Sequence, residues 1–383
     1  MKGTTQPEAA RDAGFRIPPL TRAERRRPWT FSFVLLLALF ACSCAPKRFA
    51  AQEVQRIKRP MMGTLVEVVW RTTGEHDRAE VVRGALDRME ELASRMSLYE
   101  PGSELARINA EAGKTAVSVS NEVLNVIEKS LAISRATEGA FDITVGSVEA
   151  AWGDIEHEGG GKVPAEPAIL DALSRVGYQH VRIDPEAKTV FLEREGMRID
   201  LGGIAKGYIA DQGMDWLHKG GIQAALINAG GDVLASGGPD SPSWRIGLQD
   251  PLERGGLLGV FLVRAGAVVT SGSYERYFET KEGRFTHILN PETGRPVEGL
   301  LSVTVIAEEA FAADGLATAL MVKGRRDGIS LLGRIPSTKG VLVEGDGTIW
   351  VEEGLRDVLK LNPLPSRYTL RFYPAPRPGG GRP

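Results

Sequence analysis

Residues 199–207 read IDLGGIAKG, and this stretch is the first candidate for a functional site. An apolar segment ends in Asp200, the pair Gly202-Gly203 predicts a tight turn, and a helix follows with Lys206 near its start. Backbone N–H groups and the dipole at a helix start attract anions, and a nearby lysine adds positive charge. The stretch therefore outlines an anion or nucleotide site. It matches neither the Walker A pattern nor G-x-G-x-x-G, and an Asp that caps a helix beside an exposed Lys explains it equally well.

The segments around this stretch mix helical and strand patterns without regular alternation. Apolar residues at helical spacing predict helices at 77–96, 121–135, 165–175, 203–217 and 310–322. β-Branched runs predict strands at 65–70, 180–184, 189–193, 198–201, 224–228, 244–248, 259–263 and 301–307, the second and third forming a hairpin. Residues 156–161 predict a surface turn. The mixture predicts an α+β fold rather than repeated βαβ units.

A carboxylate on the predicted helix 310–322 is the second candidate. Asp314 and Thr318 are four residues apart and therefore share one helix face. Their neighbours are alanine and leucine, so this face is expected to be buried, where a carboxylate is costly unless it is paired or bound to a cation. Mg²⁺ would satisfy it, with the Thr hydroxyl as a second oxygen ligand. A carboxylate bonded to the helix's own N-terminal backbone explains the pattern as well.

His287 is the histidine that the sequence singles out. Residues 285–296 read FTHILNPETGRP, in which Asn-Pro and Thr-Gly mark a turn after a short strand. A lone histidine is more often structural than catalytic. The other four histidines lie in polar surroundings typical of a surface, whereas His287 opens a turn rich in residues with special backbone preferences; the four are His76, His157, His180 and His218.

Two further segments join an apolar run to a glycine and a carboxylate. They are GAFDITVG at 139–146 and ALINAGGD at 225–232. Each is also explained as a strand that ends in a turn, so neither carries a functional hypothesis by itself.

The N-terminal residues predict export. Arginines 25–27 precede an apolar run at 31–41, which has the length of a signal-peptide core and is too short for a membrane span. Leu39-Phe40-Ala41-Cys42 is similar to the lipobox of bacterial lipoproteins, although Phe is unusual there, and Cys44 is a second candidate for acylation. An ordinary cleaved signal peptide is the alternative. The interpretation gives a signal peptide at 1–41 and an anchor on the extracytoplasmic side of a membrane.

The remaining chain divides simply. Residues 42–60 are expected to be a tether, 61–360 one folded domain, and 361–383 a C-terminal tail that is disordered at its end. Both cysteines, Cys42 and Cys44, precede the domain, which excludes disulfides, thiolate zinc sites and a cysteine nucleophile from it. A net charge of -2, without a basic block outside the leader, argues against nucleic acid as a partner.

Eight ordered blocks of the sequence together resemble the ApbE family, the FAD:protein FMN transferases. They span about residues 61–355 and read Met62-Gly63-Thr64, Met96-Ser97-Leu98-Tyr99 with Ser103-Glu104, Gly139-Ala140-Phe141-Asp142-Ile143-Thr144, Asp200 to Gly207, Asn228-Ala229-Gly230-Gly231-Asp232, Ser271-Gly272-Ser273-Tyr274-Glu275-Arg276, His287-Ile288-Leu289-Asn290-Pro291 with Thr293-Gly294-Arg295-Pro296, and Ala313-Asp314 with Thr318-Ala319.

The resemblance implies a T-fold-related α+β fold of mixed sheets and packed helices, with FAD in a cleft between two lobes. It implies an FAD site lined by Met62, Tyr99, Ala140, Phe141, Asp142, Asp200, Lys206 and Ile288. It also implies Mg²⁺ bound by Asp314, Thr318 and the main-chain carbonyl of Gly203. At the position of Gly203, family members have Ala, Ser or Thr. This departure of the chain from the family pattern matters little if only the main-chain carbonyl binds Mg²⁺.

The reaction implied is transfer of the FMN moiety of FAD to a Thr or Ser hydroxyl of another exported protein, with release of AMP. His287 is the candidate base for that hydroxyl, because an imidazole titrates near neutral pH. Acceptors by analogy are subunits of Rnf or sodium-pumping NADH:quinone reductase complexes, or periplasmic domains with an FMN-attachment motif. The alternatives are an FAD pyrophosphatase that yields FMN and AMP, and a non-enzymatic flavin-binding lipoprotein.

Overall fold

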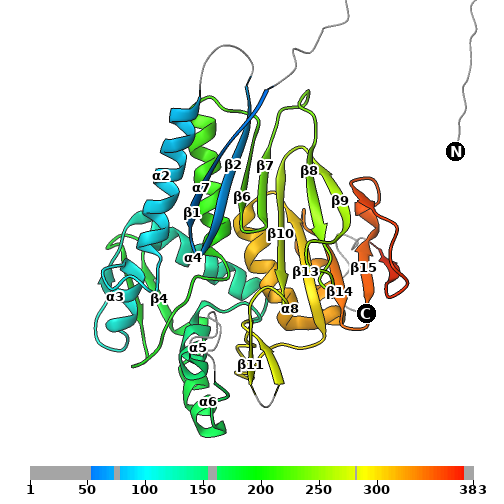
Figure 1. Ribbon diagram of the computed structural model, residues 1–383. Helices are drawn as coiled ribbons and strands as arrows, with labels where there is room; N and C mark the ends of the chain where they lie inside the picture. The colour runs from blue at the N-terminus through cyan, green and yellow to red at the C-terminus, as the bar shows by residue number, and fades with distance from the viewer. Residues whose placement is uncertain (1–52, 73–77, 154–161, 281–282, 375–383) are drawn as a thin grey trace, which may run out of the picture. The chain divides into compact units, whose positions relative to one another are not determined.

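The computed structural model describes residues 53–72, 78–153, 162–280 and 283–374 (Figure 1). All of them belong to one compact unit, Gln52–Pro383. The predicted signal peptide, both cysteines and the turn expected at 156–161 lie outside the described residues.

A nine-stranded sheet forms the centre of this unit. Neighbouring strands are antiparallel except for the last pair, which is parallel. In spatial order they are β1 (Glu53–Met61), β2 (Thr64–Thr72), β6 (Ala225–Ala229), β7 (Asp232–Ser236), β10 (Gly266–Gly272), β13 (Leu300–Ala307), β14 (Lys339–Glu344), β15 (Thr348–Glu352) and β17 (Thr369–Tyr373). An antiparallel sheet with helices beside it confirms the predicted α+β class.

Four long helices surround the main hydrophobic core: α2 (Ala79–Arg95), α4 (Asn121–Ala136), α7 (Ala205–Lys219) and α8 (Ala310–Leu332). Figure 1 shows α2 beside α7 against the β1, β2 and β6 half of the sheet, and α8 behind β10 and β13. Helix α2 buries Val82, Leu86 and Met89, whose spacing of three or four residues makes one apolar face. The backbone of α8 departs from helical geometry at Gly324.

Smaller elements complete the unit. Strands β8 (Trp244–Gln249), β9 (Leu257–Val263) and β16 (Leu359–Leu361) form a sheet that shares a second core with β7, β14 and β15. The others are α3 (Glu104–Ala110), β3 (Val117–Ser118), η1 (Ile143–Val145), α5 (Gly146–Trp152), α6 (Glu166–Leu173), η2 (Tyr178–His180), β4 (Val181–Asp184), β5 (Thr189–Leu192), β11 (Tyr277–Thr280), β12 (Gly283–Thr286) and η3 (Glu353–Leu355). The predicted hairpin is β4–β5, and a third core holds α5, α6 and Leu289 together.

The strand expected at 198–201 is wrong. The main-chain N–H of Ile199 donates to Oδ1 of Asn109 at 2.8 Å, and its carbonyl accepts from Nδ2 of the same side chain at 2.9 Å. One amide side chain thus supplies the partners that a neighbouring strand would supply. The segment therefore belongs to no sheet.

The main sheet extends beyond the domain limits predicted at 61 and 360, since both of its edge strands lie outside them. Strand β1 begins at Glu53 inside the expected tether, and β17 lies inside the expected tail. In β1, Nη1 of Arg56 and Nζ of Lys58 lie 3.7 and 3.5 Å from Oε1 of Glu67 in β2. Edge strands are commonly rich in charge, which in a sequence is indistinguishable from a polar linker.

The part of the chain that the structure describes contains no helix with the length and apolar character needed to cross a membrane.

Candidate functional site

A cavity of about 1210 Å³ lies between the main sheet, the starts of α7 and α8, and the β11–β12 hairpin. Its volume suits a large ligand. Every site residue that the sequence predicted lines this cavity, and the role of each residue stays a prediction. They are Met62, Tyr99, Ala140, Phe141, Asp142, Asp200, Gly203, Lys206, His287, Ile288, Asp314 and Thr318.

Two adjacent hairpin turns form one wall of the cavity. Met62 and Gly63 join β1 to β2 with φ of 54° and 65°, and Gly230 and Gly231 join β6 to β7 with φ of 67° and 106°. Such turns match the twist of paired strands and normally require glycine, so Met62 holds an uncommon conformation. A Cβ on Gly230 would lie 2.4 Å from Oγ1 of Thr64, so glycine also permits the close approach of the turns.

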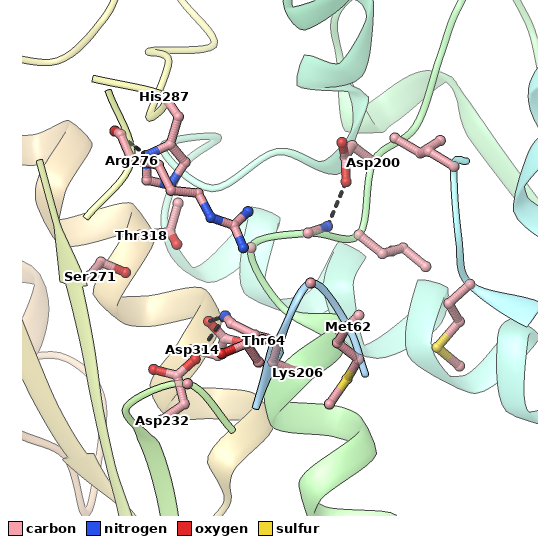
Figure 2. A pocket seen from close by; sticks show the side chains of 18 of the residues that line it. Met62, Thr64, Asp200, Lys206, Asp232, Ser271, Arg276, His287, Asp314 and Thr318 are labelled. Atoms are coloured by element: carbon pink, nitrogen blue, oxygen red, sulfur yellow. Dashed lines mark hydrogen bonds and ion pairs between the residues drawn. The ribbon is translucent and has the colours of Figure 1, made fainter. Parts of the chain in front are cut away.

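A lysine between two carboxylates occupies the inner end of the cavity (Figure 2). Nζ of Lys206 lies 2.7 Å from Oδ2 of Asp232 and 3.5 Å from Oδ1 of Asp314. Burial raises the pKa of Asp314 to about 6, although Lys206 favours its ionised form. Burial by itself would lower the pKa of Lys206, but Asp232 and Asp314 hold this pKa above its usual range. The lysine therefore stays charged.

Helices α7 and α8 hold each other at this end. The N–H of Gly207 donates to Oδ2 of Asp314 at 3.0 Å, while the carboxylate of Asp211 accepts from the N–H groups of Ala310 and Phe311, both at 2.9 Å. A Cβ on Gly207 would lie 2.4 Å from the Ala310 carbonyl oxygen, so only glycine permits this approach. Each helix thus binds a group of the other, which directs Asp314 into the cavity rather than to its own helix backbone.

Oxygen donors suited to a hard cation gather around Asp314. Oγ1 of Thr318 lies 3.3 Å from the position of a Cβ on Gly203, so the glycine turn and α8 are in close contact. Phe141 lies 3.4 Å from the same position, which explains the fit of glycine there. Carboxylate, hydroxyl and carbonyl oxygens are the ligands that Mg²⁺ prefers. Among the described residues, no three His, Cys, Asp or Glu side chains are grouped to hold a metal.

His287 directly follows β12 and is oriented by main chain. Its Nδ1 lies 2.9 Å from the carbonyl oxygen of Arg276. A carbonyl only accepts hydrogen bonds, so Nδ1 carries the hydrogen and Nε2 is the unprotonated nitrogen of the neutral ring. This is the tautomer that a general base requires, with Nε2 as the atom that takes the proton.

Asp142 and Asp200 shape the cavity wall through local hydrogen bonds. Asp142 is buried and accepts from the N–H groups of Thr144 and Tyr178 at 2.8 and 2.9 Å. Burial raises the pKa of Asp142, against these bonds. Asp200 accepts from the N–H of Gly202 at 2.5 Å and so stabilises the glycine turn. Asp200 thus stabilises the turn and lines the cavity, but it does not cap α7, whose N-cap residue is Ile204.

The outer end of the cavity is open. The side chain of Tyr99 is 67% exposed, on the turn between α2 and α3. Phe141 and Ile288 lie deeper and are buried. A flat aromatic ligand is thus offered one exposed ring near the opening and apolar groups below it.

Sequence reasoning did not predict six charged residues that line the cavity, of which Asp232 and Arg276 are the two considered further; the other four are Glu90, Glu100, Glu149 and Glu275. In the sequence, Asp232 ends a segment that carries no functional hypothesis by itself, and both Asp232 and Arg276 lie in blocks of the family resemblance. A carboxylate after two glycines indicates a turn and nothing more, so no local signal places Asp232 beside Lys206. Their membership of the ordered blocks was the one available indication.

Solved ApbE proteins, one of them a flavinyl transferase, share this fold. An ApbE protein of Thermotoga maritima superposes with a TM-score of 0.74 and 32% identity, covering 80% of this chain and 99% of that one. The apo flavinyl transferase ApbE of Pseudomonas stutzeri gives a TM-score of 0.68 and 29% identity, covering 77% and 92%. The fold and the clustered cavity residues thus define the structural class of the flavin transferases.

The sequence comparisons name the family. The ApbE family model matches residues 62–342. The FAD:protein FMN transferase of Vibrio cholerae is 30% identical over 309 residues, 80% of this chain and 90% of that protein. A protein of the same name from Klebsiella pneumoniae is 35% identical over 299 residues, 77% and 91% of the two chains. The chain belongs to the ApbE family.

Proposed function

We propose that this protein transfers the FMN moiety of FAD to a Thr or Ser hydroxyl of an acceptor protein and releases AMP, with Mg²⁺ as cofactor. The observation that carries the proposal is the convergence, in one cavity of an ApbE-family chain, of an oriented histidine with Lys206 and the oxygen groups of Asp314 and Thr318. A hydroxyl nucleophile needs a base, and a departing phosphate needs neutralisation of its charge.

The residues present fit Mg²⁺. Asp314 offers Oδ1, because its Oδ2 already accepts from the N–H of Gly207. Thr318 and the carbonyl of Gly203 would complete the protein's share, and phosphate oxygens of the substrate would supply further ligands, as is usual for this cation. When bound, Mg²⁺ supplies positive charge that stabilises the phosphate oxygens during bond cleavage.

The chain's own groups then have defined tasks. His287 accepts the acceptor's hydroxyl proton at Nε2. The hydroxyl oxygen forms a new P–O bond to the flavin-side phosphorus, the anhydride P–O bond breaks, and its electron pair leaves with AMP. Lys206 stays protonated near the phosphates, since two carboxylates hold its charge in place. Walls formed by Phe141 and Ile288 limit the access of water to the reacting atoms.

The N-terminal residues support a proposal for the location of the acceptors. We propose that the protein is exported and anchored in the membrane through Cys42, with Cys44 as the second candidate. An anchor would hold the enzyme beside extracytoplasmic acceptors that carry an FMN-attachment motif, such as subunits of the Rnf or sodium-pumping NADH:quinone reductase type.

The deciding experiment incubates the protein with FAD, Mg²⁺ and a purified acceptor domain, with and without chelator, and measures intact mass. We expect the acceptor to gain the mass of one FMN moiety only with Mg²⁺ present, and AMP to appear in equal amount. An acceptor whose attachment Thr is replaced by Val is the control. Free FMN and AMP without any gain in acceptor mass would replace the proposal with FAD hydrolysis, and intact FAD would indicate a binding protein.

A further inference from the structure

The cavity is rich in acidic side chains, although the proposed substrate is itself an anion. Among the described residues that line it, eight carry carboxyl groups and two carry a Lys or Arg cation. The carboxyl groups belong to Glu90, Glu100, Asp142, Glu149, Asp200, Asp232, Glu275 and Asp314, and the cations to Lys206 and Arg276. A diphosphate in such surroundings requires strong local compensation of its charge.

Lys206 does not provide that compensation by itself. Its ammonium lies within 3.5 Å of both Asp232 and Asp314, so these three side chains together carry a net negative charge when both carboxylates are ionised. Mg²⁺ at Asp314 would offset this excess at the inner end. The charge of the phosphate nearer to His287 still needs a partner, which directs attention to Arg276.

Arg276 reaches into the cavity from the wall that carries His287. Figure 2 shows its guanidinium projecting from that wall toward the part of the cavity that holds Lys206. Nη2 lies 3.7 Å from the position of a Cβ on Gly63, at the turn between β1 and β2. The guanidinium therefore spans the space between the β11–β12 hairpin and the opposite turn. The separation of 3.7 Å is an ordinary van der Waals contact, so the guanidinium lies against this turn.

The main chain of the same residue orients the proposed base. The carbonyl of Arg276 accepts from Nδ1 of His287 at 2.9 Å and is also approached by the His287 N–H at 3.3 Å. The guanidinium and the imidazole thus belong to two residues that are hydrogen-bonded to each other at the base of the hairpin. A phosphate held by Arg276 would lie beside the hydroxyl that His287 deprotonates.

We propose that Arg276 is a catalytic residue that binds the flavin-side phosphate of FAD. This inference rests on the proposed function. The planar guanidinium donates two hydrogen bonds to non-bridging oxygens of one phosphate, a geometry that a lysine ammonium does not reproduce. As the anhydride bond to AMP breaks and the bond to the acceptor oxygen forms, Arg276 keeps all its protons and stabilises the charge on the transferred phosphoryl group.

The test measures binding without turnover. Arg276→Gln and Arg276→Lys are titrated with riboflavin, FMN, AMP and FAD in chelator by fluorescence or calorimetry. Arg295→Gln is the matched control, since Arg295 is exposed, lies just beyond the hairpin and pairs with Glu166 on the surface. Riboflavin has the flavin ring without a phosphate, and AMP carries the other phosphate of FAD.

We expect Arg276→Gln to raise the Kd for FMN and FAD by about tenfold or more, and to leave riboflavin and AMP within about twofold of the wild type. Arg276→Lys should retain most of the FMN affinity but transfer FMN about 100-fold more slowly, because it lacks the paired donors. The control should match the wild type in every titration. The Lys variant keeps the charge and serves the test if the Gln variant does not fold.

Three results would overturn the inference: an unchanged FMN affinity in both variants, an equal loss for riboflavin, or a selective loss for AMP. Each assigns Arg276 to another part of the ligand or to the fold. Failure of the proposed function has a different signature, since the wild type would then leave the acceptor mass unchanged whatever its affinity for FMN.

Discussion

The two ends of the cavity differ in burial and in how tightly their side chains are held. At the inner end the side chains of Asp232 and Asp314 are 8% and 3% exposed, and Lys206 bridges them. At the outer end Tyr99 is 67% exposed on a turn. The inner groups are held by ion pairs and by the contact between α7 and α8, whereas the outer ring lies exposed on the turn between α2 and α3.

This difference indicates a division of labour. Charged groups in a buried, hydrogen-bonded setting keep their geometry as charge develops, which is the requirement for lowering a barrier. An exposed aromatic ring contributes contact area to a ligand that must enter and leave. Substitutions at the inner end should therefore reduce the rate, and substitutions at the outer end should mainly reduce affinity.

The largest effect is expected from Asp314→Asn. The amide removes the proposed anionic ligand of Mg²⁺ while keeping the shape of the side chain, so the proposed Mg²⁺-dependent transfer should fall by about a thousandfold or more. Steady-state rates measured across a Mg²⁺ titration check this. Asp327→Asn, an exposed position on the same helix, is the control and should behave as the wild type. A variant with normal turnover would remove Asp314 from the metal site.

His287→Ala should slow the transfer step by about 100- to 1000-fold and change the Kd for FAD by no more than about threefold. The reason is that, in the proposed reaction, Nε2 takes the proton of the acceptor hydroxyl, whereas other groups bind FAD. Single-turnover mass analysis and FAD titration separate the two quantities, with His218→Gln on the surface of α7 as the control. Equal losses of rate and affinity would mean that His287 is structural.

Asp211→Asn tests the contact between α7 and α8 that directs Asp314. An amide offers one acceptor oxygen where the carboxylate offers two, so either Ala310 or Phe311 loses its partner at the start of α8. We expect Mg²⁺ affinity, measured by calorimetry, to fall by about tenfold. Asp211→Glu retains the charge and should recover part of the affinity. Unchanged affinity in Asp211→Asn would show that the contact does not position Asp314.

Asp211→Asn should also change how the free energy of unfolding depends on pH. Burial raises the pKa of Asp211 to about 6, above the value of about 4 expected for an unfolded Asp. The folded protein therefore binds a proton in this range that the unfolded chain does not, and its free energy of unfolding falls as pH rises from about 4 to 6. Denaturant titrations should show a stability advantage of wild type over Asp211→Asn that shrinks across this window. A constant difference would contradict the raised pKa.

The smallest effect is expected at the open end, from Tyr99→Ala. Loss of one exposed ring should raise the Kd for FAD by about three- to tenfold, in line with about 1 kcal/mol for an aromatic contact, and leave the transfer rate at saturating FAD within about twofold. Tyr99→Phe keeps the ring and should match the wild type. A rate loss as large as that of Asp314→Asn would abolish the proposed division between the two ends.

How much of this was predictable differs from element to element. The bounds of helices α2, α4 and α7 were predicted to within a few residues, because the apolar residues of an amphipathic helix recur every three or four positions in the sequence. The α8 helix extends beyond the expected end at 322 because residues after Gly324 resume helical geometry. The edge strands β1 and β17 were missed, since charge on an edge strand resembles the charge of a linker.

The sequence alone determined the α+β class, through its periodicities, and the identity of the residues that gather in the cavity, through ordered motifs that resemble one family. Only the tertiary structure decided how those residues meet. Asp232 reaches Lys206 because the β1–β2 and β6–β7 hairpin turns lie side by side. Asp314 faces the cavity because α7 and α8 hold each other through Gly207 and Asp211. These contacts join residues far apart in the chain, so no local pattern of spacing or propensity specifies them.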